Sequence, residues 1–300
     1  MRAIKLFVIL VCSLFVLNAC NKQKQEKREE IEPSLAPVTY LEKRSRFITK
    51  LKYKGPSPQV YKKEIPPEGV DEVYYFSDSL KLKAWIYKPA AVQDKKLPAL
   101  VYFHGGFALS SGDYSDCKPF LDTGFVVMLP MFRGENGNPG NFEMLLGEVD
   151  DALAAIEWLV DQPYVDTNKI YGFGHSTGGV ISALMAMFPK SGLRHSGSSG
   201  GLYGQSLFAE YADAPFDKTV ESERELRCLV GNIKEMKKPH YAYVGTNDSW
   251  QELSLAKEEV KKSPGNLIIV ELEGDHFSVL PESFKRYLKQ VQEDIQGKKN

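Results

Sequence analysis

The stretch that decides the fold lies near the middle of the chain and reads Ile170-Tyr171-Gly172-Phe173-Gly174-His175-Ser176-Thr177-Gly178-Gly179. Its first residues are typical of a buried strand, and residues 179–188 have a helical pattern. Small residues around Ser176 permit a sharp turn between the two, as in the strand–turn–helix nucleophile elbow G-x-S-x-G. A structural turn is the alternative, but the flanking strand and helix patterns favour Ser176 as a nucleophile.

Strand-like and helix-like patterns alternate from Val73 onward. Such alternation predicts a mostly parallel sheet flanked by helices on both faces. With the elbow, it places the chain in the α/β class, with an α/β-hydrolase fold over residues 73–296. The expected strands are 73–76 and 80–87 as an antiparallel hairpin, then 99–103, 125–129, 170–173, 241–244 and 267–272; the expected helices are 147–160, 179–188 and 283–295.

The alternation breaks over residues 197–236. This segment has a Gly/Ser-rich start and a charged helical stretch near its end. Between them, residues 202–216 contain four aromatic side chains. We expect the whole segment to be a small cap inserted over the site. The four aromatic residues are Tyr203, Phe208, Tyr211 and Phe216.

A serine nucleophile needs a base, and in this fold the partners follow in the order Ser, Asp, His, each after a late strand. Asp248 follows the strand expected at 241–244, and His276 follows the one at 267–272. We predict that His276 takes the proton of Ser176 and that Asp248 orients its imidazole. Asn247 is the weaker alternative to Asp248. Asp275, His195 and His240 are expected to be structural.

An oxyanion forms when the serine attacks a carbonyl, and backbone N–H groups commonly stabilise it. Thr177 opens the helix after the nucleophile and offers one N–H group. Gly106 or Phe107, in the loop after the strand expected at 99–103, offers the second. His104 begins this loop; we expect it to fix the loop, with a general base or substrate contact as the alternative.

Six motifs follow one another from about residue 73 to the end, and together they resemble the catalytic domain of the prolyl oligopeptidase family of serine peptidases. The resemblance implies the α/β-hydrolase fold and the same triad. Related esterases share most of these motifs, so they specify the substrate less well than the fold. The motifs are His104-Gly105-Gly106, Arg133-Gly134 with Gly137 and Gly140, Asp150-Asp151, residues 174–179, Gly245-Thr246-Asn247-Asp248 and Gly274-Asp275-His276-Phe277.

The chain also departs from this family. Thr177 stands where the family usually has an aromatic residue, and the residues before 73 are too few for the large propeller of its classical members. We therefore expect the aromatic residues of 202–216 to select the substrate. Arg133 is a second candidate for a substrate contact, with an internal ion pair to Glu135 or Asp151 as the favoured alternative.

The N-terminus has the pattern of a targeting segment. Arg2 and Lys5 precede an apolar run over residues 6–17, which is too short for a comfortable membrane span and is typical of a secretory signal peptide. The run ends in Leu17-Asn18-Ala19-Cys20, which resembles the bacterial lipobox and makes Cys20 the candidate lipidation site. A plain signal peptide with an incidental cysteine is the alternative. We expect a signal peptide over 1–19, a flexible tether over 20–40 and an N-terminal extension over 41–72.

Composition limits the remaining partners. A net charge of -1 over 300 residues provides no field that would attract nucleic acid. Cys117 and Cys228 lack metal-ligand spacing; they are either a disulfide or two separate buried thiols. We expect no metal or organic cofactor.

The sequence therefore predicts a serine hydrolase that forms an acyl-enzyme on a small ester or a short peptide. It would be lipid-anchored in the bacterial cell envelope, in the periplasm or on the outer surface. A carboxylesterase or thioesterase without peptidase activity is the first alternative. A hydrolase-like surface lipoprotein that has lost catalysis is the second.

Overall fold

The computed structural model describes residues 38–90, 95–201, 203–205, 207–208, 211–248, 253–262 and 265–298. The predicted signal peptide, the candidate lipidation site Cys20 and most of the predicted tether lie outside the described residues. The chain separates into two compact units, Met1–Val38 and Thr39–Asn300, and every contact described below belongs to the second. Within the described residues, no helix is both long and apolar enough to cross a membrane.

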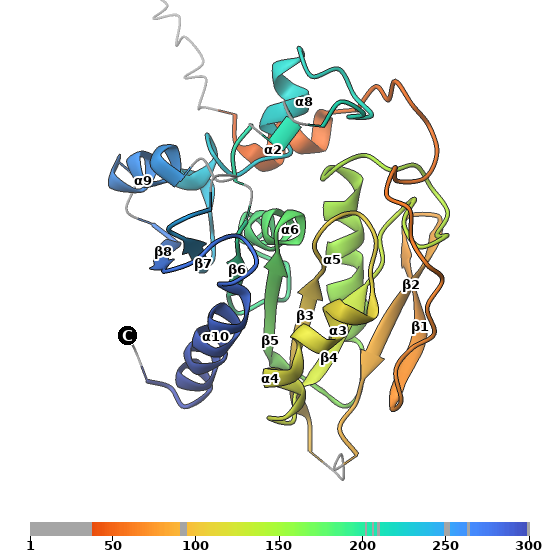
Figure 1. The fold of residues 1–300 in the computed structure, drawn as a ribbon, viewed down its shortest axis with the longest axis vertical. Helices are drawn as coiled ribbons and strands as arrows, with labels where there is room; N and C mark the ends of the chain where they lie inside the picture. Colours follow the sequence, from red (N-terminus) through yellow and green to blue (C-terminus); the bar gives the residue numbers. More distant parts are fainter. Residues whose placement is uncertain are drawn as a thin grey trace, which may run out of the picture. The chain divides into compact units, whose positions relative to one another are not determined.

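An eight-stranded sheet forms the centre of the second unit, with the strand order β1-β2-β4-β3-β5-β6-β7-β8 (Figure 1). The pairs β1–β2 and β2–β4 are antiparallel, and all the other pairs are parallel. The predicted hairpin and the predicted parallel sheet are therefore confirmed. The strands are β1 (Val70–Ser77), β2 (Leu80–Tyr87), β3 (Leu97–Phe103), β4 (Val126–Pro130), β5 (Val165–His175), β6 (Ser196–Ser199), β7 (His240–Gly245) and β8 (Leu267–Leu272).

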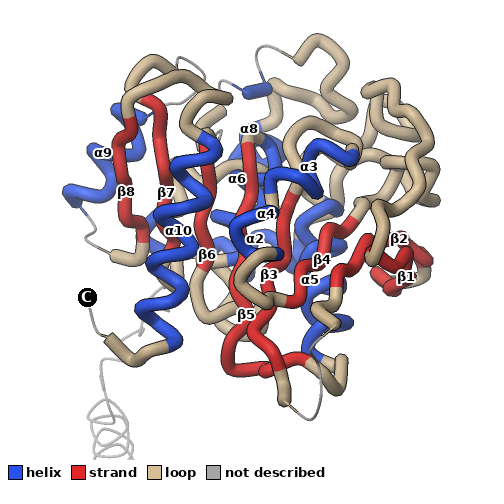
Figure 2. The backbone as a smooth tube through the Cα atoms, turned by 60° about the horizontal axis from the view of Figure 1, so that its bottom comes forward, coloured by secondary structure: helices blue, strands red, loops and turns tan. Residues whose placement is uncertain are grey.

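Helices cover both faces of the sheet (Figures 1 and 2). Helices α5 and α6 belong to the larger core cluster on one face, whereas α4 and α10 supply buried side chains to a second cluster on the other face. The helices are α2 (Tyr40–Arg46), α3 (Ser111–Asp116), α4 (Lys118–Leu121), α5 (Gly147–Val160), α6 (Thr177–Met185), α8 (Glu221–Glu225), α9 (Leu253–Lys262), α10 (Leu280–Ile295) and the 3-10 helix η1 (Ile233–Glu235).

Strand β3 shows how the two clusters are built. Val101 and Phe103 point into the cluster under α5 and α6, whereas Leu100 and Tyr102 point into the cluster under α10. All four side chains are fully buried. Burial of one such apolar side chain stabilises the fold by about 1.5–3 kcal/mol, so a strand buried on both faces anchors the loop that follows it.

Strand β6 corrects the predicted start of the cap, because residues 197–199 belong to the central sheet. The strand reads Ser196-Gly197-Ser198-Ser199 and therefore has no apolar pattern. Its neighbours explain this composition, since a Cβ atom on Gly197 would lie 2.6 Å from the ring of Tyr287 in α10. The Ser196 and Ser198 hydroxyls lie 2.7 and 2.8 Å from the two ring nitrogens of His240.

The chain between α2 and β1, residues 47–69, runs over the surface without regular structure, and we call it the strap (Figure 1). Backbone hydrogen bonds attach it to the rest of the domain: Lys52 N–H donates to Pro215 O, Ser57 N–H to Gly134 O, and Phe142 N–H to Gly55 O, at 2.6 to 2.9 Å. The strap therefore contacts both the cap and the loop after β4. Strand β1 begins three residues before the predicted start of the hydrolase domain.

Candidate active site

Ser176 occupies the turn between β5 and α6, with φ 56° and ψ −119°. This backbone conformation is rare for a residue with a side chain and costs about 1–3 kcal/mol. The flanking glycines are required sterically: a Cβ atom on Gly174 would collide with the backbone of Gly178, and one on Gly178 with that of Phe103. The turn leaves Ser176 partly exposed while its neighbours are buried, which is the geometry that an attacking hydroxyl needs.

The loops after β7 and β8 bring Asp248 and His276 together. His276 Nδ1 lies 2.8 Å from Asp248 Oδ2, and the Asp248 side chain is fully buried. Backbone hydrogen bonds connect the two loops, from Thr246 N–H to Leu272 O at 2.8 Å and from Asn247 N–H to Gly274 O at 2.9 Å. Asp248 therefore has the contact that the triad requires, whereas Asn247 is exposed.

His276 lies against His175, the residue before Ser176, and against Gly200, which follows β6. His175 Nε2 donates to the carbonyl oxygen of His276 at 3.1 Å, and the two imidazole rings are 4.9 Å apart. Ser176 N–H donates to Ser199 O at 3.1 Å, and a Cβ atom on the next residue, Gly200, would lie 2.9 Å from His276 Nδ1. The structure therefore collects the predicted triad at one edge of the sheet.

His175 is a neutral part of this arrangement. Burial lowers its pKa, and the nearby His276 lowers it further, although the hydrogen bond to the His276 carbonyl acts in the opposite direction. A neutral His175 adds no positive charge beside His276. The catalytic roles of Ser176, His276 and Asp248 are predictions that this geometry allows.

The loop after β3 lies against the start of α6. Thr177 Oγ1 donates to Gly106 O at 2.6 Å, and Phe107 N–H donates to Gln59 Oε1 at 2.7 Å. In the part of the chain that the structure describes, the N–H groups of Gly106 and Thr177 have no protein acceptor. Of the two alternatives for the second oxyanion donor, the geometry thus favours Gly106 over Phe107.

His104 is not a surface group of the site, because its side chain is buried. Its Nε2 lies 3.1 Å from Glu135 Oε2, and its Nδ1 lies 3.1 Å from Gly105 O. Burial opposes the charged imidazolium, but the adjacent Glu135 carboxylate outweighs it and raises the pKa of His104 to about 9. His104 therefore fixes the loop through a buried ion pair, in agreement with the favoured prediction, and the proposed substrate contact is not supported.

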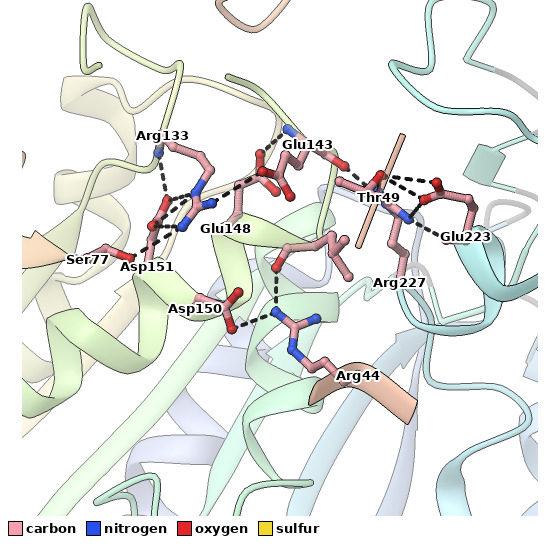
Figure 3. A network of polar contacts seen from close by, with 11 residues as sticks. Arg44, Thr49, Ser77, Arg133, Glu143, Glu148, Asp150, Asp151, Glu223 and Arg227 are labelled. Atoms are coloured by element: carbon pink, nitrogen blue, oxygen red, sulfur yellow. Dashed lines mark hydrogen bonds and ion pairs between the residues drawn. The ribbon is translucent and has the colours of Figure 1, made fainter. Parts of the chain in front are cut away.

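Arg133 is also engaged inside the protein (Figure 3). Its guanidinium Nη2 lies 2.7 Å from Asp151 Oδ1 and its Nε 3.0 Å from Asp151 Oδ2, while Nη1 lies 3.3 Å from Glu143 Oε1. The predicted internal ion pair is therefore made with Asp151 of α5 and not with Glu135. Because the fully buried Asp151 binds the edge formed by Nε and Nη2, and Glu143 accepts from Nη1, we no longer expect Arg133 to contact substrate.

The cap supplies fewer aromatic side chains to the site than expected. Tyr203, Phe208 and Phe216 are buried in the larger core cluster. Tyr211 alone of the four is partly exposed, and its ring lies 5.3 Å from that of Phe107 in the loop after β3. Part of the predicted insertion, including residues 202, 206, 209 and 210, lies outside the described residues.

Sequence reasoning missed two residues near the site and named Phe277 only as part of a motif. Ser57 and Gln59 of the strap contact the loop after β3, and nothing in their local pattern distinguishes them from other polar loop residues. Phe277 is 73% exposed and stands edge-on to His276, with ring centroids 5.0 Å apart. Its position directly after the predicted histidine was the signal that could have found it.

Across the described ranges, no group of three or more His, Cys, Asp and Glu residues could hold a metal ion. Cys117 and Cys228 are both buried and form no disulfide. They lie in different core clusters, which decides between the two alternatives in favour of separate thiols.

The sheet order, the serine at the β5–α6 turn and the Asp–His pair after β7 and β8 define the class: an α/β-hydrolase domain with the site of a serine hydrolase. The comparisons agree with this class. The family model described as X-Pro dipeptidyl-peptidase (S15 family) matches residues 78–198, which include the nucleophile turn. The expected resemblance to a serine peptidase domain of this superfamily is therefore confirmed.

The proteins that the chain resembles include peptidases and an esterase. The uncharacterized peptidase YtmA of Bacillus subtilis is 31% identical over 117 residues, which are 38% of this chain and 44% of YtmA. The acylaminoacyl peptidase of Pyrococcus horikoshii has a TM-score of 0.59 at 19% identity, covering 75% of this chain and 41% of that one. The esterase PF2001 of Pyrococcus furiosus has a TM-score of 0.62 at 16% identity, covering 81% and 98%. The chain thus spans less than half the length of both peptidases.

Proposed function

We propose that the protein hydrolyses short peptides or small esters through an acyl-enzyme on Ser176. The observation that carries the proposal is the 2.8 Å contact between His276 Nδ1 and Asp248 Oδ2, beside a serine in the conformation of a nucleophile elbow. His276 takes the hydroxyl proton as Ser176 attacks the carbonyl, and Asp248 stabilises the imidazolium that forms. His276 then returns the proton to the leaving group, and water resolves the acyl-enzyme.

The N–H groups of Gly106 and Thr177 stabilise the oxyanion in this proposal. Support comes from the absence of a protein acceptor for either group among the described residues. Such donors act because they are already oriented when negative charge develops, and losing one typically costs about 2.7–4 kcal/mol of transition-state stabilisation.

Labelling with a fluorophosphonate tests the proposal. Intact-mass measurement should show one adduct on the wild type and none on Ser176→Ala, while His276→Ala should react far more slowly, because the serine loses its base. Circular dichroism confirms that each variant folds. A well-folded wild type that does not react would contradict the proposal and favour a surface lipoprotein that has lost catalysis.

Model substrates can distinguish peptide cleavage from ester cleavage as the activity of this protein. The match to a peptidase family model supports amide turnover, whereas the esterase that the chain covers almost end to end supports ester turnover. Aminoacyl-arylamides and short aryl esters assayed side by side, with Ser176→Ala as the blank, separate the two. If esters are hydrolysed and amides are not, the protein is not a peptidase, and the carboxylesterase or thioesterase alternative remains.

We further propose that Cys20 carries the lipid anchor of an envelope protein. The supporting pattern is an apolar run over residues 6–17 that ends in Leu17-Asn18-Ala19-Cys20. Each buried methylene of an acyl chain contributes about 0.8 kcal/mol, so two or more chains give stable attachment. Cys20→Ser should release the protein from membranes and lower its mass by the lipid; unchanged fractionation and mass would refute lipidation.

A further inference from the structure

The strap lies directly against the loop that offers the proposed oxyanion donor. Ser57 Oγ donates to Phe107 O at 2.8 Å, and Gln59 Oε1 accepts from Phe107 N–H at 2.7 Å. Ser57 Oγ also accepts from Gln59 N–H at 3.2 Å, so the two strap residues hold one another in place. Both polar groups of the Phe107 backbone are therefore bonded to the strap.

The peptide group between Gly106 and Phe107 is held at both ends. Its carbonyl accepts from Thr177 Oγ1 at 2.6 Å, and its N–H donates to Gln59. Gly106 has φ +64°, and a Cβ atom there would lie 2.6 Å from Gln59 Oε1. Glycine is therefore needed for the close approach, and its conformational freedom must be restrained by neighbouring groups.

We infer that Gln59 is a positioning residue for the oxyanion hole, a role that rests on the function proposed above. By holding Phe107 N–H, the Gln59 carboxamide fixes the peptide that follows Gly106 and limits rotation of Gly106. The Gly106 N–H then stays directed toward the reacting carbonyl, together with that of Thr177. Orientation fixed before the reaction is what makes such donors effective.

A competing interpretation is that the Gln59 carboxamide occupies the oxyanion site and blocks it. The contacts argue against this interpretation. Gln59 Oε1 accepts from Phe107 N–H, while the Gly106 and Thr177 N–H groups have no acceptor among the described residues. The strap thus leaves both proposed donors available for substrate.

The test replaces Gln59 by leucine, which has a similar size and no acceptor. Gln59→Leu should lower kcat for an aryl ester about fivefold to tenfold, as expected for one lost hydrogen bond. KM should stay within about twofold, because the substrate carbonyl needs the oriented donor mainly in the transition state. The inhibition constant of an alkyl boronate, which forms a tetrahedral adduct, should rise by the same factor as kcat falls.

Charge provides a second readout, which reports whether the side chain at position 59 lies close enough to the oxyanion to influence it. Gln59→Glu keeps an acceptor for Phe107 N–H but places a carboxylate near the oxyanion. The ratio of its kcat to that of wild type should be lowest at pH values where the carboxylate is ionised. The ratio should rise toward one as the pH falls and the carboxylate becomes protonated. The same profile in both proteins would overturn the inference.

Val60→Ala is the matched control, since Val60 is the next strap residue and is 95% exposed. It should leave kcat unchanged. If the wild type is active and Gln59→Leu has the same kcat, the positioning role is overturned and the proposed function stands. If Gln59→Leu turns over faster than wild type, the positioning role is also overturned and Gln59 instead blocks the site. An unreactive wild type would overturn both. If Gln59→Leu does not fold, Gln59→Asn, one methylene shorter, is measured by the same criteria.

Discussion

The order Ser, Asp, His along the chain predicts an acidic partner for His276 in this turn, but the local sequence does not show which residue of the turn reaches the histidine. Asn247 stands beside Asp248 in the same turn, and both follow a predicted strand. The structure separates them, because Asp248 is buried against His276 and Asn247 faces solvent. A carboxylate in this position holds the imidazole in the tautomer that can accept the serine proton.

Asp248→Asn should lower kcat by about a factor of 10⁴, because an amide favours the wrong tautomer of His276. The melting temperature should change little, since the side chain keeps its shape. Steady-state kinetics on the aryl ester or aminoacyl-arylamide that the wild type hydrolyses measure the effect. Asn247→Ala is the control and should have wild-type kinetics; a comparable loss in that variant would contradict the assignment.

At the scale of elements, periodic segments were predicted well and irregular ones were not. Helix α5 occurs over the predicted residues because its apolar positions recur with helical spacing. Strand β8 likewise has the predicted bounds. Strand β6 was missed because serine and glycine give no hydrophobic pattern, although the strand is paired on both sides. The contact between His276 and Asp248 could be expected from the motifs. The contact between Gln59 and Phe107 could not, because it joins residues 48 positions apart that have no distinctive local pattern.

Gly197→Ala tests the close packing of β6 against α10. The added methyl group would meet the Tyr287 ring, which is itself fully buried, so either the ring or the strand must shift. We expect a loss of about 1–3 kcal/mol in the free energy of unfolding, the usual cost of overpacking. Urea unfolding measures it. Gly112→Ala is the control, because φ there is not positive and the nearest atom to an added Cβ is Ser110 Oγ at 3.4 Å, an ordinary contact.

Glu148, in the first turn of α5, makes stability depend on pH. Burial raises the pKa of its carboxyl group from near 4.5 to about 8. The folded protein therefore keeps a proton that the unfolded chain releases, so this contribution to stability is fully present below about pH 4.5 and is lost as the pH rises through about 8. The nearby charges of Glu135 and Asp151 also raise the pKa of Glu148.

Glu148→Gln cannot ionise and should remove this part of the pH dependence. The variant should be more stable than wild type at pH 8, by an amount of the order of a few kcal/mol, and the difference should shrink toward pH 4.5. Urea unfolding from pH 4 to 9 measures it. Glu72→Gln, at an exposed position of β1, should run parallel to wild type; a Glu148→Gln curve that also runs parallel would refute the prediction.

At the scale of the whole domain, buried polar groups connect the cap to the strap and to the loop before α5 (Figure 3). Arg227 in the cap is fully buried, pairs with Glu223 at 2.5 Å and donates to Thr49 Oγ1 in the strap at 3.0 Å. Its Nε also donates to Glu143 O at 3.0 Å. One side chain thus joins three segments that are far apart in sequence.

Arg227→Met should destabilise the domain by about 3–5 kcal/mol, because it leaves the Glu223 carboxylate buried without its partner. Calorimetric melting measures the loss. Lys43→Met removes a more exposed ion pair with Glu225 and should change stability by less than about 1 kcal/mol. Equal effects of the two substitutions would contradict the importance of the buried pair.

The two separate thiols have a consequence for how opening of the molecule can be observed. Cys117 lies in the core under α10, and Cys228 lies in the core that includes the cap. Burial raises the pKa of the Cys117 thiol and keeps it protonated, so a thiol-specific reagent modifies it only when that core opens. Single-cysteine forms would therefore report, by their modification rates, whether the cap opens independently of the sheet or only with global unfolding.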